Sequence, residues 1–228
     1  MTTNKYGNIL TIILIILVVA ILIGLGLITY KYVIKPNKDN DDKIEAFAEI
    51  DKVAEEKKDN KEEDKEETGD LLEMEGIGNE NNPASGEGQT KTKPRYKGFV
   101  MLGYITIPKT NVKEPILDTV TPETLNTAVA VLYPSNPQLN QPGNTVIIGH
   151  NYRNGTFFSN NKKLSTGDKI KIKDNSGTEL TYTIYEVFET TEQDTSFYNR
   201  DTNGAIEVTL STCTDDAKAR TIILARVE

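Results

Sequence analysis

The stretch Ile206-Glu-Val-Thr-Leu-Ser-Thr-Cys213 and the stretch Arg220-Thr-Ile-Ile-Leu-Ala-Arg-Val227 decide the fold of this 228-residue chain. Both are rich in β-branched and large apolar residues, which predicts two strands, and the polar residues 214–219 between them predict a loop. The chain therefore reverses its direction after Cys213. We expect Cys213 and Arg220 to lie at the facing ends of two consecutive strands.

Cys213 is the only cysteine of the chain and His150 is its only histidine. A free thiol is mostly protonated at neutral pH, so a nucleophilic cysteine needs a base or a cation beside it. A histidine can supply the base, and the permanently charged fork of an arginine suits a developing oxyanion. The alternative is a cysteine packed as a small apolar side chain and a histidine with no catalytic role. A single cysteine excludes an intrachain disulfide.

The motifs around these residues point to one family. Residues 209–213 read Thr-Leu-Ser-Thr-Cys, Arg220 follows seven residues later, and His150 closes the apolar run that begins at Val146. In their order and spacing these motifs resemble those of the sortases, over about residues 96–228. The resemblance implies an eight-stranded β-barrel enzyme.

The resemblance also implies the chemistry of the site. Cys213 would attack the Thr carbonyl of an LPXTG-like sorting signal on a secreted surface protein. Arg220 would stabilise the oxyanion, and His150 would protonate the leaving Gly amine. An amine of the cell wall or of its precursor would then accept the acyl group. Thr212 and Asn151 are expected to contact the substrate.

No cofactor is expected. One His and one Cys are too few for a structural zinc site, and the acidic residues lack the spacing of a calcium-binding loop. Some sortases bind calcium through carboxylates on the loops around their groove, and the sequence leaves that question open. No nucleic-acid partner is expected.

Residues 96–228 are predicted to form the mainly β catalytic domain. Besides the final two strands, alternating or continuous apolar runs predict strands at 103–107, 112–117, 129–133, 145–149, 169–173 and 181–188. The pair Thr121-Pro122 predicts the start of a short helix. A further helical turn is predicted within 155–164, where Phe157 and Phe158 are expected in the core. Eight short strands predict a closed or nearly closed, largely antiparallel barrel.

Residues 1–35 are predicted to anchor the chain in a membrane. The segment 9–30 carries no charged side chain and is long enough, at about 1.5 Å per residue, to cross a hydrocarbon core of about 30 Å. A cleaved signal peptide is the alternative, but its apolar region should be shorter. Lysines after the span outnumber those before it, which would place the C-terminal part inside the cell. The sortase resemblance implies a single-pass protein with its catalytic domain on the cell-wall side, and we prefer that orientation.

Residues 36–95 are predicted to form a charged, disordered linker. Between Asp41 and Glu67 most residues are Asp, Glu or Lys, and the larger apolar residues are Ile44, Phe47, Ile50 and Val53. These are too few to fold alone, and their spacing by three predicts only a weak amphipathic turn. Residues 1–95 hold 13 basic and 19 acidic side chains against 13 and 15 in 96–228. Most of the net charge of −8 thus lies outside the catalytic domain, which favours a solvated spacer.

Two alternatives to a sortase transpeptidase stay open. A hydrolytic cysteine peptidase would use the same three residues, and a non-catalytic peptide-binding β-barrel would pack Cys213 as a structural residue. The class of sortase is also open. The short connection 190–203 favours a class A-like or class D-like enzyme, whereas His150-Asn151 followed by Gly155 and Phe158 is class B-like.

Overall fold

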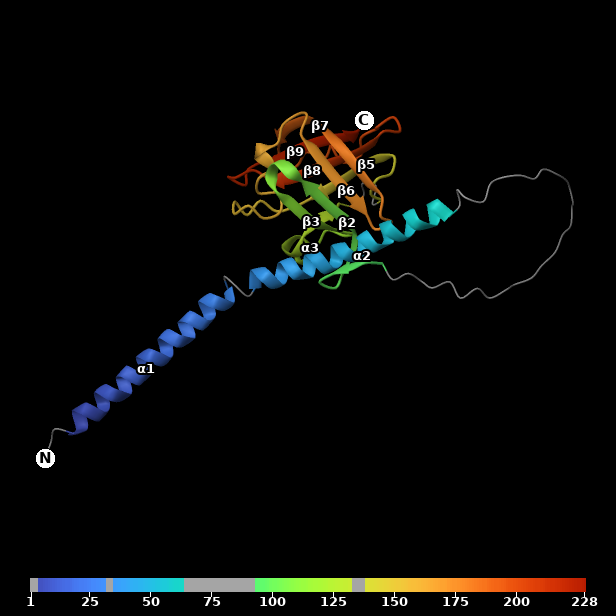
Figure 1. The fold of residues 1–228 in the computed structure, drawn as a ribbon. Coiled ribbons are helices and arrows are strands. Elements are labelled where there is room, and N and C mark those ends of the chain that lie inside the picture. The colour runs from blue at the N-terminus through green and yellow to red at the C-terminus, as the bar shows by residue number, and fades with distance from the viewer. Residues whose placement is uncertain (1–3, 32–34, 64–92, 133–137) are drawn as a thin grey trace, which may run out of the picture. The chain divides into compact units, whose positions relative to one another are not determined.

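The computed structural model describes residues 4–31, 35–63, 93–132 and 138–228. The chain divides into two compact units, Met1–Glu45 and Ala46–Glu228. In chain order the helices and strands are α1 (Asn4–Thr29), α2 (Lys35–Glu63), β1 (Arg95–Tyr96), β2 (Phe99–Ile107), β3 (Val112–Leu117), α3 (Pro122–Thr127), β4 (Val129–Val131), β5 (Gly143–Ile148), β6 (Lys169–Asp174), β7 (Glu179–Thr190), β8 (Ile206–Cys213) and β9 (Arg220–Val227) (Figure 1).

Strands β2 to β9 form a closed eight-stranded barrel, to which the two-residue β1 is added beside β2 (Figure 1). The strand order is β2-β3-β4-β5-β8-β9-β7-β6, and β6 pairs back with β2 to close the ring. The β3–β4 and β5–β8 pairs are parallel, and the other ladders are antiparallel. The predicted fold class is confirmed: the eight predicted strands are present, and closure leaves the barrel no open sheet edge.

The barrel interior is filled by alternate residues of its strands, because successive side chains of a strand point to opposite faces. Val208 and Leu210 of β8 and Ile223 and Ala225 of β9 belong to this core. The predicted core positions of Phe157 and Phe158 are confirmed, since these side chains are 8% and 0% exposed. In α3, the side chain of Thr121 caps the first turn and Pro122 begins the helix, as predicted.

The same alternation gives the sheet β5-β8-β9-β7 an outer face. Thr209, Ser211 and Cys213 of β8 lie between the inward-facing residues and therefore point away from the interior. Val146, Ile222 and Leu224 belong to a separate apolar cluster with Phe197 and Phe188. We call this side of the sheet the outer face.

Helix α1 has the length and composition of a membrane-spanning helix. Among the described residues, one segment meets these criteria, Ile9–Thr29, with a mean hydropathy of 3.3. Its large apolar side chains are exposed. Such a helix is a possible membrane anchor, as the sequence predicts.

The prediction of a disordered linker from residue 36 onward is wrong for its first part, because α2 occupies Lys35–Glu63. From Ala46 on, this helix belongs to the same compact unit as the barrel. Phe47 and Ile50 are 5% and 0% exposed and pack in a cluster with Tyr104 and Met101 of β2. Burying two such side chains stabilises a fold by about 2 kcal/mol each. The rest of the predicted linker, residues 64–92, lies outside the described residues.

Polar contacts add to this packing. Asp51 of α2 accepts hydrogen bonds from the Tyr104 hydroxyl at 3.0 Å and from Lys173 Nζ at 2.6 Å. Lys113 Nζ lies 4.7 Å from the centre of the Phe47 ring and 4.9 Å from that of Tyr104, within the range of a cation–π contact. A segment that could not fold alone is thus helical because the barrel supplies a surface for it.

Candidate active site

Cys213 and Arg220 lie side by side at the ends of two neighbouring strands, and the only histidine, His150, follows the end of a third. Cys213 of β8 pairs directly with Arg220 of β9. On the other side of β8, Ile148 of β5 pairs with Ser211 in parallel register, and His150 follows two residues after Ile148. Because paired residues share a face, Cys213 and Arg220 lie on the outer face. We call His150, Cys213 and Arg220 the candidate triad.

The guanidinium of Arg220 contacts the thiol: its Nη1 donates to Cys213 Sγ at 3.7 Å. Both side chains are half-buried, so the sulfur is accessible from one side while a fixed cation lies beside it. The next residue across the sheet, Thr190 of β7, pairs with Arg220, and its hydroxyl donates to Asp194 at 2.6 Å.

The histidine is held by its neighbours. The ring of Tyr152 lies 4.9 Å from that of His150, centre to centre, and the Tyr152 hydroxyl donates to Asn126 of α3 at 2.8 Å. Gly149 precedes the histidine at a point where a Cβ would lie 2.7 Å from Phe158 and 2.8 Å from Val129. Only glycine fits there without displacing the core.

Next to Cys213 and Arg220 the outer face is apolar and holds the unpaired hydroxyl of Ser211. Ser211 lies two residues before Cys213 and pairs with Ile148 on one side and Ile222 on the other. Ser211 is 1% exposed, and its hydroxyl has no hydrogen-bond partner within the described chain. A buried hydroxyl without a partner costs free energy.

Thr212 does not share the face of Cys213. It faces the barrel interior, is 2% exposed, and its hydroxyl has no partner within the described chain. It lines a pocket of about 140 Å³ with Cys213, Thr221, Phe158 and Glu189. The structure thus places Thr212 next to Cys213 in the strand, with its side chain on the opposite face.

Asn151 contacts β8 rather than open solvent. Its Nδ2 donates to the carbonyl oxygen of Cys213 at 3.0 Å and to Asp215 Oδ1 at 2.9 Å. Asp215 also pairs with Lys162. The hydrogen bonds from Lys162, and secondly from Asn151, hold the pKa of Asp215 below its usual range.

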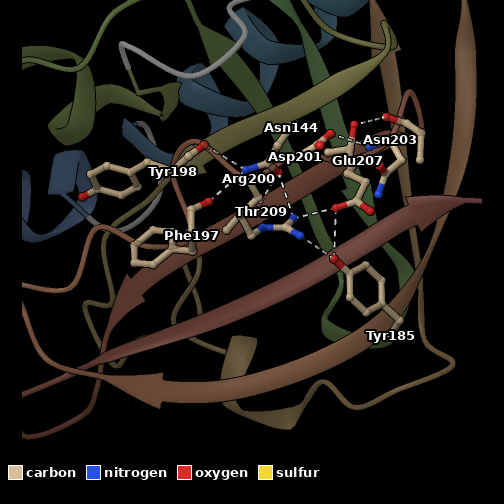
Figure 2. A network of polar contacts seen from close by, with 11 residues as sticks. Asn144, Tyr185, Phe197, Tyr198, Arg200, Asp201, Asn203, Glu207 and Thr209 are labelled. Carbon is tan, nitrogen blue, oxygen red and sulfur yellow. Dashed lines mark hydrogen bonds and ion pairs between the residues drawn. The ribbon is translucent and has the colours of Figure 1, made fainter.

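A polar network closes the far end of the outer face (Figure 2). Asn144 of β5 donates to the carbonyl oxygens of Phe197 and Tyr198 at 2.9 and 3.1 Å. Its own Oδ1 accepts from Thr209 at 2.8 Å and from Arg200 Nη2 at 3.4 Å. These bonds tie the connection between β7 and β8 to the sheet.

An ion pair lies at the centre of this network. Arg200 Nη2 lies 2.6 Å from Glu207 Oε2, and the Glu207 side chain is only 8% exposed. Tyr185 accepts from Arg200 Nη1 at 2.8 Å and donates to Glu207 at 3.0 Å. Burial, and then the hydrogen bond to Glu207, raises the pKa of Tyr185. The polar network is therefore Asn144, Tyr185, Arg200, Glu207 and Thr209.

Metal ligands are not clustered in the described parts of the chain: no group of three or more His, Cys, Asp or Glu residues there could hold a metal ion. The absence of a cofactor stays a prediction. Sequence reasoning missed Asp215, Lys162 and the polar network. The position of Asn151 next to the histidine was the only signal in the sequence for the contacts around Cys213.

The comparisons with known proteins agree with this topology. The sequence model of the sortase domain matches residues 105–228. A sortase D5 transpeptidase of Clostridium perfringens is 30% identical, with 57% of this chain and 79% of that chain covered and a TM-score of 0.52. A lid mutant of sortase A from Corynebacterium diphtheriae is 26% identical, with 57% of this chain and 71% of that chain covered and a TM-score of 0.53. Sortase C1 of Streptococcus agalactiae is 25% identical, with 56% of this chain and 68% of that chain covered and a TM-score of 0.51. No curated protein matches the chain.

The barrel topology and the meeting of the only cysteine with an arginine at one rim define a β-barrel protein with a cysteine-centred site. The chain belongs to the sortase family. The predicted resemblance is thereby confirmed, and the solved relatives come from classes D, A and C.

Proposed function

We propose that this protein is a membrane-anchored transpeptidase that cleaves an LPXTG-like sorting signal between Thr and Gly and joins the new carboxyl end to an amine of the cell wall. The observation that carries the proposal is the contact of Arg220 Nη1 with Cys213 Sγ at 3.7 Å. His150 follows the strand that pairs with β8 on its other side. A buried structural cysteine would not need a cation beside its sulfur.

In the first step the Cys213 thiolate attacks the Thr carbonyl carbon of the sorting signal. The carbonyl oxygen becomes negative, and the guanidinium of Arg220 stabilises it with a directed N–H donor. The C–N bond to Gly breaks as His150 gives its proton to the leaving amine. A thioester between Cys213 and the substrate Thr remains, and the C-terminal fragment departs.

In the second step an amine of the cell wall or its precursor attacks the thioester. His150, now neutral, takes the proton of the attacking amine. The new amide forms, the C–S bond breaks, and the Cys213 thiolate is regenerated. The same site would act as a hydrolytic peptidase if water attacked instead, so the acceptor decides between the two functions.

The remaining assignments follow from the family and from α1. Helix α1 anchors the chain in the cell membrane as a single span, with the catalytic domain on the cell-wall side. Its protein substrates are secreted surface proteins that end in an LPXTG-like signal. Thr212 contributes to the substrate site as a lining residue of the pocket that it shares with Cys213, and no cofactor takes part.

A product assay tests the proposal. The full chain in detergent micelles is incubated with LPXTG-type peptides, with and without a series of amine acceptors, beside Cys213→Ala. We expect Cys213-dependent cleavage and, with an acceptor, a peptide–amine product in mass spectrometry. Cleavage that yields only the free acid with every amine would support the peptidase. No Cys213-dependent turnover of any peptide would overturn the enzyme assignment in favour of a binding module.

A further inference from the structure

The backbone ladder between β5 and β8 ends one residue before the catalytic histidine. The Gly149 N–H donates to the Ser211 carbonyl at 3.2 Å. In a parallel ladder the next donor on the same strand is two residues later, so the next bond would run from the Asn151 N–H to the Cys213 carbonyl. The chain leaves β8 before that point, because Asn151 instead pairs with Phe157 in an isolated bridge.

We propose that Asn151 is a positioning residue whose side chain replaces the missing backbone bond and thereby holds His150 beside Cys213. Its Nδ2 reaches the same acceptor, the Cys213 carbonyl, at 3.0 Å. The histidine is thus attached to β8 on both sides, through Gly149 before it and Asn151 after it. This inference rests on the proposed function, because it assigns the step in which His150 and Cys213 exchange protons.

The amide of Asn151 is fully used by these contacts. Its second Nδ2 hydrogen goes to Asp215 Oδ1 at 2.9 Å, and its Oδ1 accepts from the Arg153 N–H at 3.0 Å. Asp215 lies two residues after the nucleophile and is paired with Lys162. The side chain therefore joins the loop after the histidine to both the end of β8 and the turn that follows it.

These contacts explain why an amide is needed. An aspartate at 151 would lose both donors and would place a carboxylate against the Cys213 carbonyl and the Asp215 carboxylate. Removing the amide would leave the His150 peptide attached to β8 on one side only. A displacement of about 1 Å between reacting groups costs about 100-fold in rate.

The lone cysteine gives a readout that needs no peptide substrate. Alkylation of the full chain in detergent modifies Cys213 alone, so its rate against pH reports the thiolate in the field of Arg220 and His150. We expect the curve of alkylation rate against pH for Asn151→Ala to move toward the curve for His150→Ala. Asn154→Ala is the matched control: Asn154 lies in the same loop and bonds Thr156 within it. Its profile should superimpose on that of the unaltered chain.

Turnover of an LPXTG-type peptide supplies the second readout. For Asn151→Ala we expect kcat to fall about 10- to 100-fold with KM within about threefold, since a positioning role acts on the chemical step. Asp215→Ala should show a smaller loss, and the double variant should lose less than the product of the two single losses. A melting temperature within a few degrees of the unaltered chain shows that each variant is folded.

The outcomes separate the two proposals. An Asn151→Ala variant with an unchanged alkylation profile and unchanged kcat would overturn the positioning role while the transpeptidase assignment stands. A raised KM with unchanged kcat would also overturn it, in favour of direct substrate contact. If the unaltered chain cleaves no peptide, the proposed function fails. The curve of alkylation rate against pH then tests by itself whether Asn151 holds His150 beside Cys213. Should Asn151→Ala not fold, Asp215→Ala carries the same test, because it removes one of the two acceptors of the Asn151 amide.

Discussion

The two ends of the outer face differ in what their polar side chains bond. At the far end, Asn144, Arg200 and Glu207 bond one another and the backbone of the β7–β8 connection. At the other end, within the described chain, the Arg220 side chain bonds the Cys213 thiol at 3.7 Å, and both side chains are half-buried. One end therefore holds a connection to the sheet, whereas the other leaves a thiol and a guanidinium partly accessible.

Among the substitutions that test this difference, we expect the largest effect on peptide turnover at Arg220. Arg220→Lys keeps the charge and loses the planar fork, so kcat should fall about 100- to 1000-fold. Arg226→Lys is the matched control, because Arg226 lies on the same strand and the same face at the opposite end, over the Tyr185 ring. Peptide turnover of the two variants checks this. Equal losses would show that Arg220 has no special role at the thiol.

At the far end, removal of the buried anion should affect stability more than chemistry. Glu207→Ala leaves Arg200 without its partner and should lower the free energy of unfolding by about 3 kcal/mol, which corresponds to a fall in melting temperature of about 6–12 °C. Glu192 is an exposed acidic residue of the same connection. Glu192→Ala should change neither the free energy of unfolding nor the melting temperature. Thermal unfolding measures the difference, and Cys213 alkylation should be unchanged. A changed rate of Cys213 alkylation in Glu207→Ala would show that the far end of the outer face also affects the thiol, which contradicts this prediction.

Helix α2 offers a third region for comparison, because its packing contributes to stability far from the thiol. Ile50→Ala should lower the free energy of unfolding by about 2–3 kcal/mol, since Ile50 is fully buried. Ile44→Ala is the matched control, with a side chain that is 65% exposed. Urea unfolding of both variants measures the effect. If Ile50→Ala were as stable as Ile44→Ala, α2 would not be part of the folded unit.

The smallest expected effect is the pH dependence of the α2 contact. Burial raises the pKa of Asp51, but the hydrogen bonds from Lys173 and Tyr104 and the nearby lysine charges outweigh it, and the pKa lies below its usual value. A depressed pKa stabilises the folded state above the unfolded pKa of about 4, and this stabilisation disappears as the pH falls through the folded pKa. The side chain is 42% exposed, so screening limits the effect to about 0.5 kcal/mol.

The direction of this pH dependence is checked by measuring the free energy of unfolding of the unaltered chain and of Asp51→Asn at pH 7 and pH 3. The two proteins should differ at pH 7, and the difference should be smaller at pH 3. A difference that grew toward low pH would mean that the Asp51 carboxylate is destabilising in the folded state.

The sequence predicted the parts of this molecule that depend on local pattern. Alternation of apolar residues predicted the eight strands of the barrel, and the motifs around Cys213 predicted which strand ends meet. Helix α2 was not predicted, because four apolar residues spaced by three drift around a helix, and only Phe47 and Ile50 of the four are fully buried. Their burial depends on a surface of β2 that no local pattern reveals.

The contacts of the site were predicted less completely for the same reason. Asn151 was identified as a neighbour of the histidine, but its acceptors, Cys213 and Asp215, lie more than 60 residues away in sequence. The ion pair of Arg200 with Glu207 looks in the sequence like two ordinary surface charges. Polar networks of this kind need the strand register before their members can be matched.

The central claim is that Cys213 forms a covalent acyl intermediate in the field of Arg220. Intact-mass spectrometry of the full chain, mixed briefly with an LPXTG-type peptide and quenched in acid, tests it most directly. We predict an adduct with the mass of the peptide up to its Thr, which maps to Cys213, is absent in Cys213→Ala and is strongly reduced in Arg220→Lys. Peptide turnover without any adduct on Cys213, or an adduct that forms equally well in Arg220→Lys, would contradict this mechanism.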